Sequence, residues 1–148
     1  MATNYTNYYS YYGTYSDDSI TNSGKYATIN AYAGNDTVNN YAGGAVVLGG
    51  DGNDTIYSSV TSTINGGYGY VTLSGGYGAD TIRSVDGHVS VSGGSGADVI
   101  TIGGSFNPGY NTVNGGWGND TISLAGGHNV IQFDYLDDYD MIYGIADT

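Results

Sequence analysis

Aspartate is the residue type with which this sequence could do chemistry, and it recurs beside glycine. The chain has 148 residues, of which 27 are Gly, and all 14 acidic residues are Asp rather than Glu. Exclusive use of the shorter carboxylate indicates that turn geometry or a bound metal selects it. The repeated segments read SDDSI, AGNDTV, GGDGNDTI, GGYGADTI, GGSGADVI, GGWGNDTI and DDYDMI, centred on Asp18, Asp36, Asp54, Asp80, Asp98, Asp120 and Asp140.

The spacing of these aspartates defines a repeat. Successive positions differ by 18, 18, 26, 18, 22 and 20 residues, so the base period is 18. We expect the longer spacings to contain loop insertions, near 61–69 and 106–110. Two apolar columns keep register with the aspartates. The column two residues after each Asp consists of Ile20, Val38, Ile56, Ile82, Ile100, Ile122 and Ile142. The column seven residues before consists of Ile29, Val47, Leu73, Val91, Val113 and Phe133.

These columns predict an all-β chain, because strands so short bury a core only when coils stack and the columns become ladders. We expect a parallel β-solenoid, or β-roll, of about seven coils with about 18 residues per coil. Residues 16–148 form this solenoid, with a degenerate C-terminal coil. Residues 1–15 are a Tyr-rich segment that caps the end or pairs between subunits. The residues that we expect to serve self-assembly are Tyr5, Tyr8, Tyr9, Tyr11 and Tyr12.

The motif GGxGxDxUx, where U is apolar, is complete at 49–56, 75–82, 93–100 and 115–122. It resembles the RTX, or hemolysin-type calcium-binding, repeats over about residues 16–142. Calcium takes six to eight oxygen ligands, and glycines let a turn direct several carbonyl groups to one point. In this family the ion sits between equivalent turns of adjacent coils.

The resemblance implies Ca²⁺ as the bound metal and assigns its ligands by motif position. The implied aspartates are Asp36, Asp54, Asp80, Asp98 and Asp120, and the asparagines are Asn35, Asn53 and Asn119. The implied glycines are Gly34, Gly50, Gly52, Gly76, Gly78, Gly94, Gly96, Gly116 and Gly118. Asp18 and Asp140 lack the glycines and are expected to act as caps, with metal binding as the alternative. Because the motif recurs once per coil, calcium should line mainly one edge, opposite metal-free turns.

Composition excludes several classes of function. A formal net charge of −12, with Lys25 and Arg83 as the only basic residues besides histidine, disfavours nucleic acid and anionic membranes. There is no Cys and no apolar run of membrane-spanning length, so disulfides and membrane insertion are not expected. His88 and His128 fall on turns, and a filled solenoid interior leaves no substrate cavity. We therefore expect no enzymatic activity.

An array without an attached functional domain favours a structural role. Open solenoid ends predict head-to-tail self-association into an extracellular filament or surface matrix. An alternative is a carbohydrate-binding or adhesion module that uses Tyr68, Tyr77 and Trp117. Ice binding is disfavoured by the irregular turn column Ala33, Asp51, Tyr77, Ser95 and Trp117. A secretion module of a larger toxin or protease is disfavoured by Met1.

Weak extracellular calcium sites predict a chain that folds outside the cell. The first 16 residues lack the basic and apolar regions of a cleaved signal peptide. The resemblance implies a bacterial source and type I export through an uncleaved signal, for which 133–148 is the expected segment.

Overall fold

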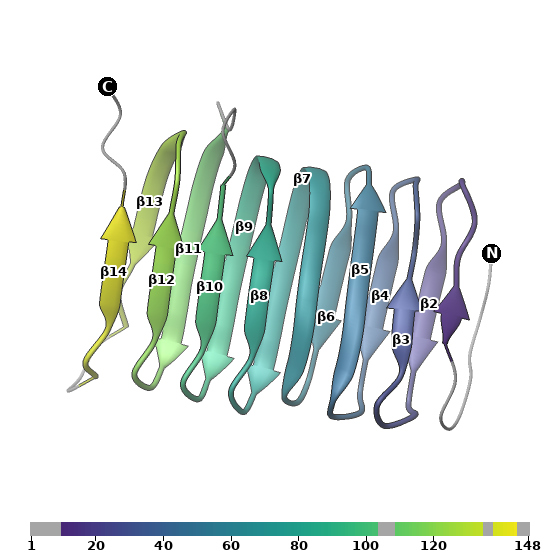
Figure 1. The fold of residues 1–148 in the computed structure, drawn as a ribbon, viewed down its shortest axis with the longest axis horizontal. Coiled ribbons are helices and arrows are strands. Elements are labelled where there is room, and N and C mark those ends of the chain that lie inside the picture. The colour runs from purple at the N-terminus through teal and green to yellow at the C-terminus, as the bar shows by residue number, and fades with distance from the viewer. Residues whose placement is uncertain (1–9, 104–108, 135–137, 145–148) are drawn as a thin grey trace.

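The computed structural model describes residues 10–103, 109–134 and 138–144, which form strands and turns without a helix. About seven coils stack into a parallel β-solenoid, which confirms the predicted architecture and coil length (Figure 1). The strands are β1 (Tyr11–Tyr12), β2 (Ser19–Asn22), β3 (Thr28–Asn30), β4 (Thr37–Asn40), β5 (Ala45–Asp51), β6 (Thr55–Ser58), β7 (Ser62–Tyr77), β8 (Thr81–Ser84), β9 (Asp86–Ser95), β10 (Val99–Ile102), β11 (Tyr110–Trp117), β12 (Thr121–Leu124), β13 (His128–Gln132) and β14 (Met141–Gly144). No described segment is a helix of the length and hydropathy needed to cross a membrane.

The strands form two faces, and all pairing between successive coils is parallel. The first face contains β1, β3, β5, the start of β7, β8, β10, β12 and β14. The second face contains β2, β4, β6, the end of β7, β9, β11 and β13. Strands of the first face run upward in Figure 1, so they begin at the edge that we call the lower edge. Strands of the second face begin at the opposite, upper edge.

The core follows from strict alternation of side chains along each strand. In strands such as β6, β8 and β10 the burial pattern alternates exposed and buried residues, so that β6 and β8 each point one β-branched residue inward and β10 points two, Ile100 and Ile102. Ile56, Ile82 and Ile100 are each at most 1% exposed. Burying one such side chain contributes about 1.5–3 kcal/mol, and the apolar contacts come from neighbouring coils and from the opposite face of the solenoid.

In the middle of the solenoid, the two apolar columns predicted from the sequence spacing change from one face to the other. Ile56 of β6 pairs with Leu73, whereas Ile82 of β8 pairs with Ile64. Residues on either side of this point that share an offset from Asp therefore lie on different faces. At the C-terminal end Ile131, rather than Phe133, pairs with Val113, and Phe133 is exposed. The expected single-register columns are wrong at these positions.

The cause of the exchange is strand β7, which occupies the segment where we expected a loop insertion. Residues 62–68 of β7 pair with β5 on the first face, and residues 71–77 pair with β9 on the second. The spacing of 26 residues between Asp54 and Asp80 is thus one and a half coils rather than one coil with a loop. The second expected insertion, near 106–110, lies largely in 104–108, outside the described residues.

Paired cysteines test this register, because the chain contains no natural Cys. Thr63 and Thr81 are exposed partners in the structure, whereas Thr55 and Thr81 would be partners if the spacing were a looped coil. Parallel neighbours lie about 4.8 Å apart, within the range of about 4.4–6.8 Å that a disulfide spans. Thr63→Cys with Thr81→Cys should oxidise within one chain, measured by thiol counting and mass spectrometry. The control pair, Thr55→Cys with Thr81→Cys, should stay reduced, and its oxidation would refute the register.

Candidate metal centre

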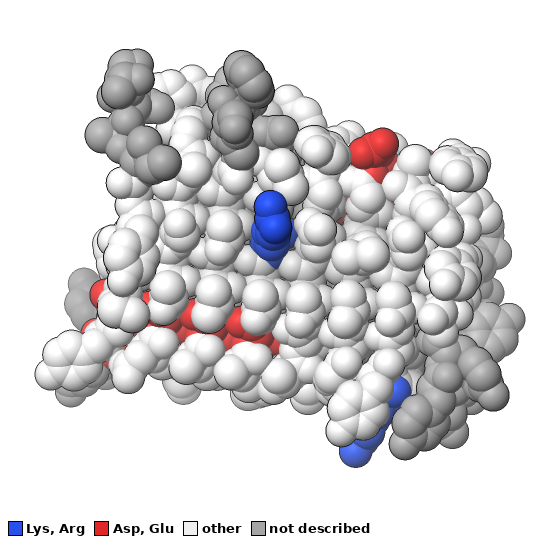
Figure 2. All heavy atoms as spheres, in the orientation of Figure 1, with Lys and Arg blue, Asp and Glu red and all other residues white. Residues whose placement is uncertain are grey.

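The predicted aspartates lie in two ladders on opposite edges of the solenoid. Asp18, Asp36 and Asp54 directly precede β2, β4 and β6 at the upper edge. The second ladder, formed by Asp80, Asp98 and Asp120, directly precedes β8, β10 and β12 at the lower edge. Figure 2 shows acidic atoms along the lower edge of the C-terminal half and another acidic patch at the upper edge of the N-terminal half. The expectation of metal turns mainly along one edge is therefore wrong, because β7 shifts the repeat by half a coil.

Each carboxylate is used first to join two coils. One oxygen, Oδ1 of Asp36, accepts a hydrogen bond from the backbone N–H of Asp18 at 2.8 Å, and Oδ1 of Asp54 accepts from Asp36 at 2.9 Å. The same bond runs from Asp80 to Asp98 and from Asp98 to Asp120, each at 2.8 Å. The ladder therefore holds successive turns in register through one oxygen of each aspartate.

The second carboxylate oxygen, Oδ2, has no hydrogen-bond partner in the described structure although it is buried. This holds for Asp36, Asp54, Asp80, Asp98 and Asp120, each of which is 1% exposed. Burying an ionised carboxylate oxygen without compensation costs several kcal/mol, so native structures pair such groups or place them against metals. Five repetitions of the same vacant acceptor indicate that a cation belongs beside them.

Glycines shape the space around each Oδ2. A Cβ added to Gly49 or Gly75 would lie 2.7 or 2.8 Å from the Oδ2 of Asp54 or Asp80, so only glycine leaves room there. The nine predicted turn glycines all have positive φ, between 90° and 139°. A Cβ on Gly52 would collide with the carbonyl oxygen of Gly34 in the preceding coil. A Cβ on Gly49 would also meet the carbonyl oxygen of Gly66, and one on Gly75 that of Gly93, so a glycine carbonyl of the adjacent coil borders the same space as Oδ2.

The donor set fits a hard divalent cation. One carboxylate oxygen per coil and the carbonyl oxygens of stacked glycines are oxygen ligands, which calcium prefers and which can come from flexible turns. The described residues contain no group of three or more His, Cys, Asp or Glu side chains that could hold a metal by themselves. A site here must therefore combine backbone carbonyls with one or two aspartates, so thiolate- or imidazole-preferring metals do not match it.

The electrostatics of the ladder also call for a cation. Burial raises the pKa of Asp54 and Asp120 to about 6 and that of Asp80 to about 7, from 3.8. Burial likewise raises the pKa of Asp36 and Asp98. Neighbouring aspartates add repulsion, such as that of Asp36 on Asp54. A positive ion beside each Oδ2 would reverse this penalty and keep the carboxylates ionised at neutral pH.

The predicted asparagines hold turns together from outside the ladder. Oδ1 of Asn35 accepts the N–H of Asn53 at 2.9 Å, and Oδ1 of Asn53 accepts the N–H of Tyr70 at 3.0 Å. Oδ1 of Asn119 accepts the N–H of Tyr139 at 3.0 Å. All three side chains are exposed, and their assignment as metal ligands stays a prediction.

The terminal copies continue the ladders. Asp18 is 4% exposed and its Oδ2 accepts hydrogen bonds from the N–H and hydroxyl groups of Thr14 at 2.5 and 2.9 Å. Asp140 accepts the N–H of Asp120 at 2.9 Å. Asp140 therefore repeats the bonding of the inner copies, whereas Asp18 is held by Thr14 of its own turn and donates its N–H to Asp36.

Two amide ladders, which the sequence analysis missed, occupy the edges opposite the aspartates. Nδ2 of Asn22 donates to Oδ1 of Asn40 at 2.7 Å, and Nδ2 of Asn40 donates to Oγ of Ser58 at 2.9 Å. Nδ2 of Asn111 donates to Oδ1 of Asn129 at 2.8 Å in the C-terminal half. Their signal in the sequence is recurrence at 18 residues, the same period as that of the aspartates. These turns need no ion, because amides supply both donor and acceptor.

Protonation of the buried aspartates should stabilise the metal-free protein, as a bound cation would. A carboxyl group whose pKa is raised on folding favours the folded state below its unfolded pKa, and this contribution is lost as pH rises through the folded pKa. The metal-free protein should therefore become more stable as pH falls from about 7 to about 4. We expect a rise in Tm on the order of 5 °C, followed by circular dichroism. With a saturating divalent cation the trend should reverse, because protons then compete with the ion. A metal-free Tm that falls steadily over this pH range would contradict the assignment.

Comparison with known proteins agrees with this geometry. The family described as RTX calcium-binding nonapeptide repeat (4 copies) matches residues 28–47, 40–59, 61–88, 74–105 and 107–131. No curated protein and no solved structure matches the chain significantly. Because the matched segments cover more than half of the sequence, the repeats and their buried aspartate ladders assign the chain to a family: it belongs to the RTX calcium-binding nonapeptide repeat proteins.

Proposed function

We propose that this protein is a secreted, calcium-stabilised structural repeat protein that assembles end to end into an extracellular filament or surface matrix. The observation that carries the calcium part is the buried Oδ2 atom without a partner, repeated at five aspartates. The family is one of calcium-binding repeats. Calcium supplies positive charge between adjacent turns, and the role that we propose for it is structural rather than catalytic.

An extracellular site of action is consistent with the chemistry of the ladders. Proteins with RTX repeats are typically extracellular and bacterial. Extracellular calcium modules bind with dissociation constants of about 10⁻⁴ to 10⁻³ M, so cytosolic calcium would leave the carboxylates uncompensated. We propose export by a type I route without a cleaved signal peptide, followed by folding outside the cell.

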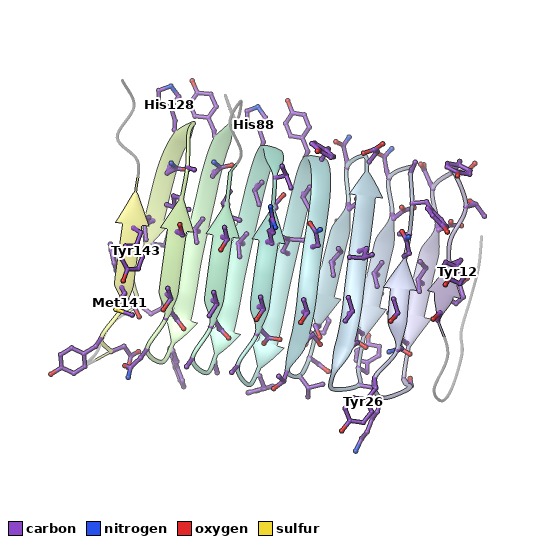
Figure 3. All side chains as sticks on the ribbon, in the orientation of Figure 1. Tyr12, Tyr26, His88, His128, Met141 and Tyr143 are labelled. Atoms are coloured by element: carbon purple, nitrogen blue, oxygen red, sulfur yellow. The ribbon has the colours of Figure 1, made fainter. Side chains whose placement is uncertain are left out.

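The C-terminal end of the solenoid supports self-assembly. Ile142 of β14 is 36% exposed, whereas Ile122 at the same position of the preceding coil is 1% exposed. Among the described residues no strand follows β14 in the first face or β13 in the second. Met141 and Tyr143 add exposed apolar surface there (Figure 3). A second copy of the chain is the partner that would continue both the backbone pairing and the core columns.

The opposite end carries tyrosines. Tyr11 and Tyr12 form β1, pair with Ile29 and Asn30, and extend the first face by one strand. The ring of Tyr12 stacks on Tyr32 at a centroid distance of 6.2 Å. The predicted assembly residues Tyr5, Tyr8 and Tyr9 lie outside the described residues. We propose that this tyrosine-bearing end meets the apolar C-terminal end of the next copy.

The substitution Asp98→Asn tests whether Asp98 is a cation ligand in addition to accepting a hydrogen bond. The amide keeps the shape and an oxygen for the N–H of Asp80 but removes the buried charge. Without calcium this variant should be more stable than the parent at pH 7.5, because burial raises the pKa of Asp98 and its charge therefore destabilises the folded state. Its gain in stability on adding calcium should be smaller, and calorimetry should show fewer ions bound. Asp134→Asn, an exposed change outside the ladders, is the control. An unchanged calcium stoichiometry in Asp98→Asn would remove Asp98 from the site.

Filament formation is tested at the apolar end. We expect Ile142→Lys to abolish filaments in electron micrographs and to shift sedimentation to the monomer, because it places charge on the end of the core column. Val46→Lys is the matched control, since Val46 is 37% exposed but lies mid-solenoid on the first face. Removal of calcium with a chelator should dissolve filaments of the parent. If the folded, calcium-loaded parent is monomeric at all concentrations, self-assembly is refuted and calcium binding is not.

A further inference from the structure

Four aromatic rings form a continuous stack along the upper edge of the C-terminal half. They belong to Tyr70, His88, Tyr110 and His128, one from each successive coil at the start of the second-face strands. Their centroids are 4.6, 5.7 and 4.9 Å apart, with interplanar angles of 3°, 17° and 20°. The labelled histidines stand outward at this edge in Figure 3. From the sequence alone, His88 and His128 were expected only to fall on turns.

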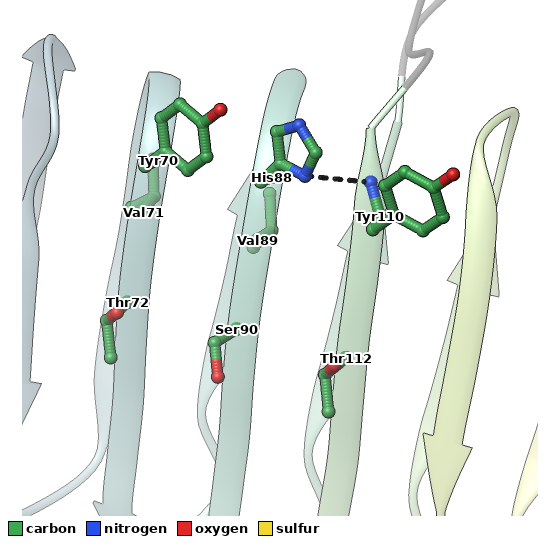
Figure 4. A pocket seen from close by; sticks show the side chains of 8 residues that line it. All are labelled: Tyr70, Val71, Thr72, His88, Val89, Ser90, Tyr110 and Thr112. Atoms are coloured by element: carbon green, nitrogen blue, oxygen red, sulfur yellow. Dashed lines mark hydrogen bonds between the residues drawn. The ribbon is translucent and has the colours of Figure 1, made fainter.

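A trough runs beside this ring stack. Its volume is about 240 Å³, and it crosses three coils (Figure 4). Tyr70, His88 and Tyr110 form one wall, and a file of hydroxyl-bearing residues forms the other. That file is Thr72, Ser90 and Thr112, which are register partners on the second face. Each coil thus presents one ring and one hydroxyl group to the trough, repeated at the strand spacing of about 4.8 Å.

The trough is polar and uncharged, in contrast to the rest of the chain. None of its eight lining residues is Asp, Lys or Arg, although the chain carries a net charge of −12. The ladder of Asp80, Asp98 and Asp120 lies at the lower edge, across the solenoid, and Asp54, the last aspartate of the upper-edge ladder, lies one coil before Tyr70 and does not line the trough. The backbone N–H of Tyr110 donates to Nδ1 of His88 at 3.1 Å, which places the proton of the neutral ring on Nε2. Rim atoms therefore include imidazole N–H and tyrosine hydroxyl groups beside the file of Thr and Ser hydroxyls.

We propose that this trough binds a neutral, extended polysaccharide chain lying along the solenoid axis. The rims of the Tyr and His rings, combined with the aligned Thr and Ser hydroxyl groups, offer a sugar both apolar contact and hydrogen-bond partners. The strand spacing of about 4.8 Å is close to the advance per residue of a β-1,4-linked pyranose chain, so each coil would meet one sugar. The ring faces within the stack are taken by one another, so the sugar contacts ring edges and hydroxyls rather than stacking on a face. The absence of basic residues from the lining disfavours acidic polysaccharides.

The trough does not include Tyr68, Tyr77 or Trp117, the residues that the sequence suggested for carbohydrate binding. Tyr68 lies in the column of Asp51 and Asp86 at the upper edge, whereas Tyr77 and Trp117 share a lower-edge column with Ser95 between them. These three residues therefore do not form one surface. Tyr77 is 72% exposed and Tyr110 is 64% exposed, which makes Tyr77 a matched control for ring removal.

Isothermal titration calorimetry in calcium-containing buffer tests the proposal. The probes are neutral β-1,4-linked oligomers of glucose, N-acetylglucosamine and mannose of increasing length, and a β-1,4-linked uronic acid oligomer. We expect at least one neutral series to bind with millimolar or better affinity, tightening up to the length that spans the stacked coils. Tyr110→Ala should weaken binding about tenfold, and Thr112→Val, which removes one hydroxyl at constant shape, by a smaller factor. Tyr77→Ala and Thr63→Val, on other surfaces, should bind as the parent does.

The results of these binding experiments can be told apart from a failure of calcium binding. Circular dichroism of each variant checks the fold, and Tyr110→Phe, which keeps the ring and removes only the hydroxyl, replaces Tyr110→Ala if the latter unfolds. Absence of binding by every neutral oligomer to the calcium-loaded, folded protein would overturn the proposal. Stronger binding of the uronic acid oligomer, or equal weakening by Tyr77→Ala and Tyr110→Ala, would do so as well. None of these results would alter the assignment of the aspartate ladders.

Discussion

A buried carboxylate with one satisfied and one vacant oxygen is the constraint on which this solenoid depends. Oδ1 accepts the N–H of the aspartate one coil earlier, so the side chain fixes how successive turns stack. Oδ2 points into the glycine turn, where the described structure offers it no donor. The same side chain thus orders the coils and destabilises them. The uncompensated charge therefore lowers the stability of the folded state, and a cation or a proton beside Oδ2 would restore it.

The amide ladders also join adjacent coils by side-chain hydrogen bonds, but they are neutral and need no ion. Asn22 and Asn40 join coils by amide hydrogen bonds at the lower edge, while Asp18 and Asp36 join the same coils at the upper edge. In the C-terminal half the arrangement is exchanged, with Asn111 and Asn129 at the upper edge. These coils are thus fastened at one edge by neutral amides and at the other by carboxylates. The buried charge is thus confined to one edge of each of these coils, and the amide hydrogen bonds at the other edge join the coils independently of that charge.

Much of the fold could be predicted from residue type and spacing, because one coil length and two inward positions define a solenoid. The inward positions of Ile82 and Ile100 and the interior location of the aspartates at the turns follow directly from the repeat. The edge assignment does not, because a spacing of 26 residues fits either a looped coil or one and a half coils. Only strand pairing distinguishes them, since GGYGYVTLSGGY reads equally as a glycine-rich loop and as two strand segments joined by a turn. The stack of Tyr70 and His88 was missed for a related reason, because residues 18 apart become neighbours only after the coil register is known.

Strand β7 makes the two ladders mechanically dependent on one another although they lie on opposite edges. Its first part pairs with β5 and β8, and its last part pairs with β6 and β9, so both faces of both halves meet in one continuous segment. At the start of β7, Ser62 connects the amide ladder to the aspartate ladder of the lower edge. The hydroxyl of Ser62 accepts from Asn40 at 3.0 Å, and its N–H donates to Oδ1 of Asp80 at 2.5 Å. In a solenoid, stability passes only between neighbouring coils, so charge compensation in one half reaches the other through this strand. A single half-coil shift therefore separates two rows of like charge while keeping the array one cooperative unit.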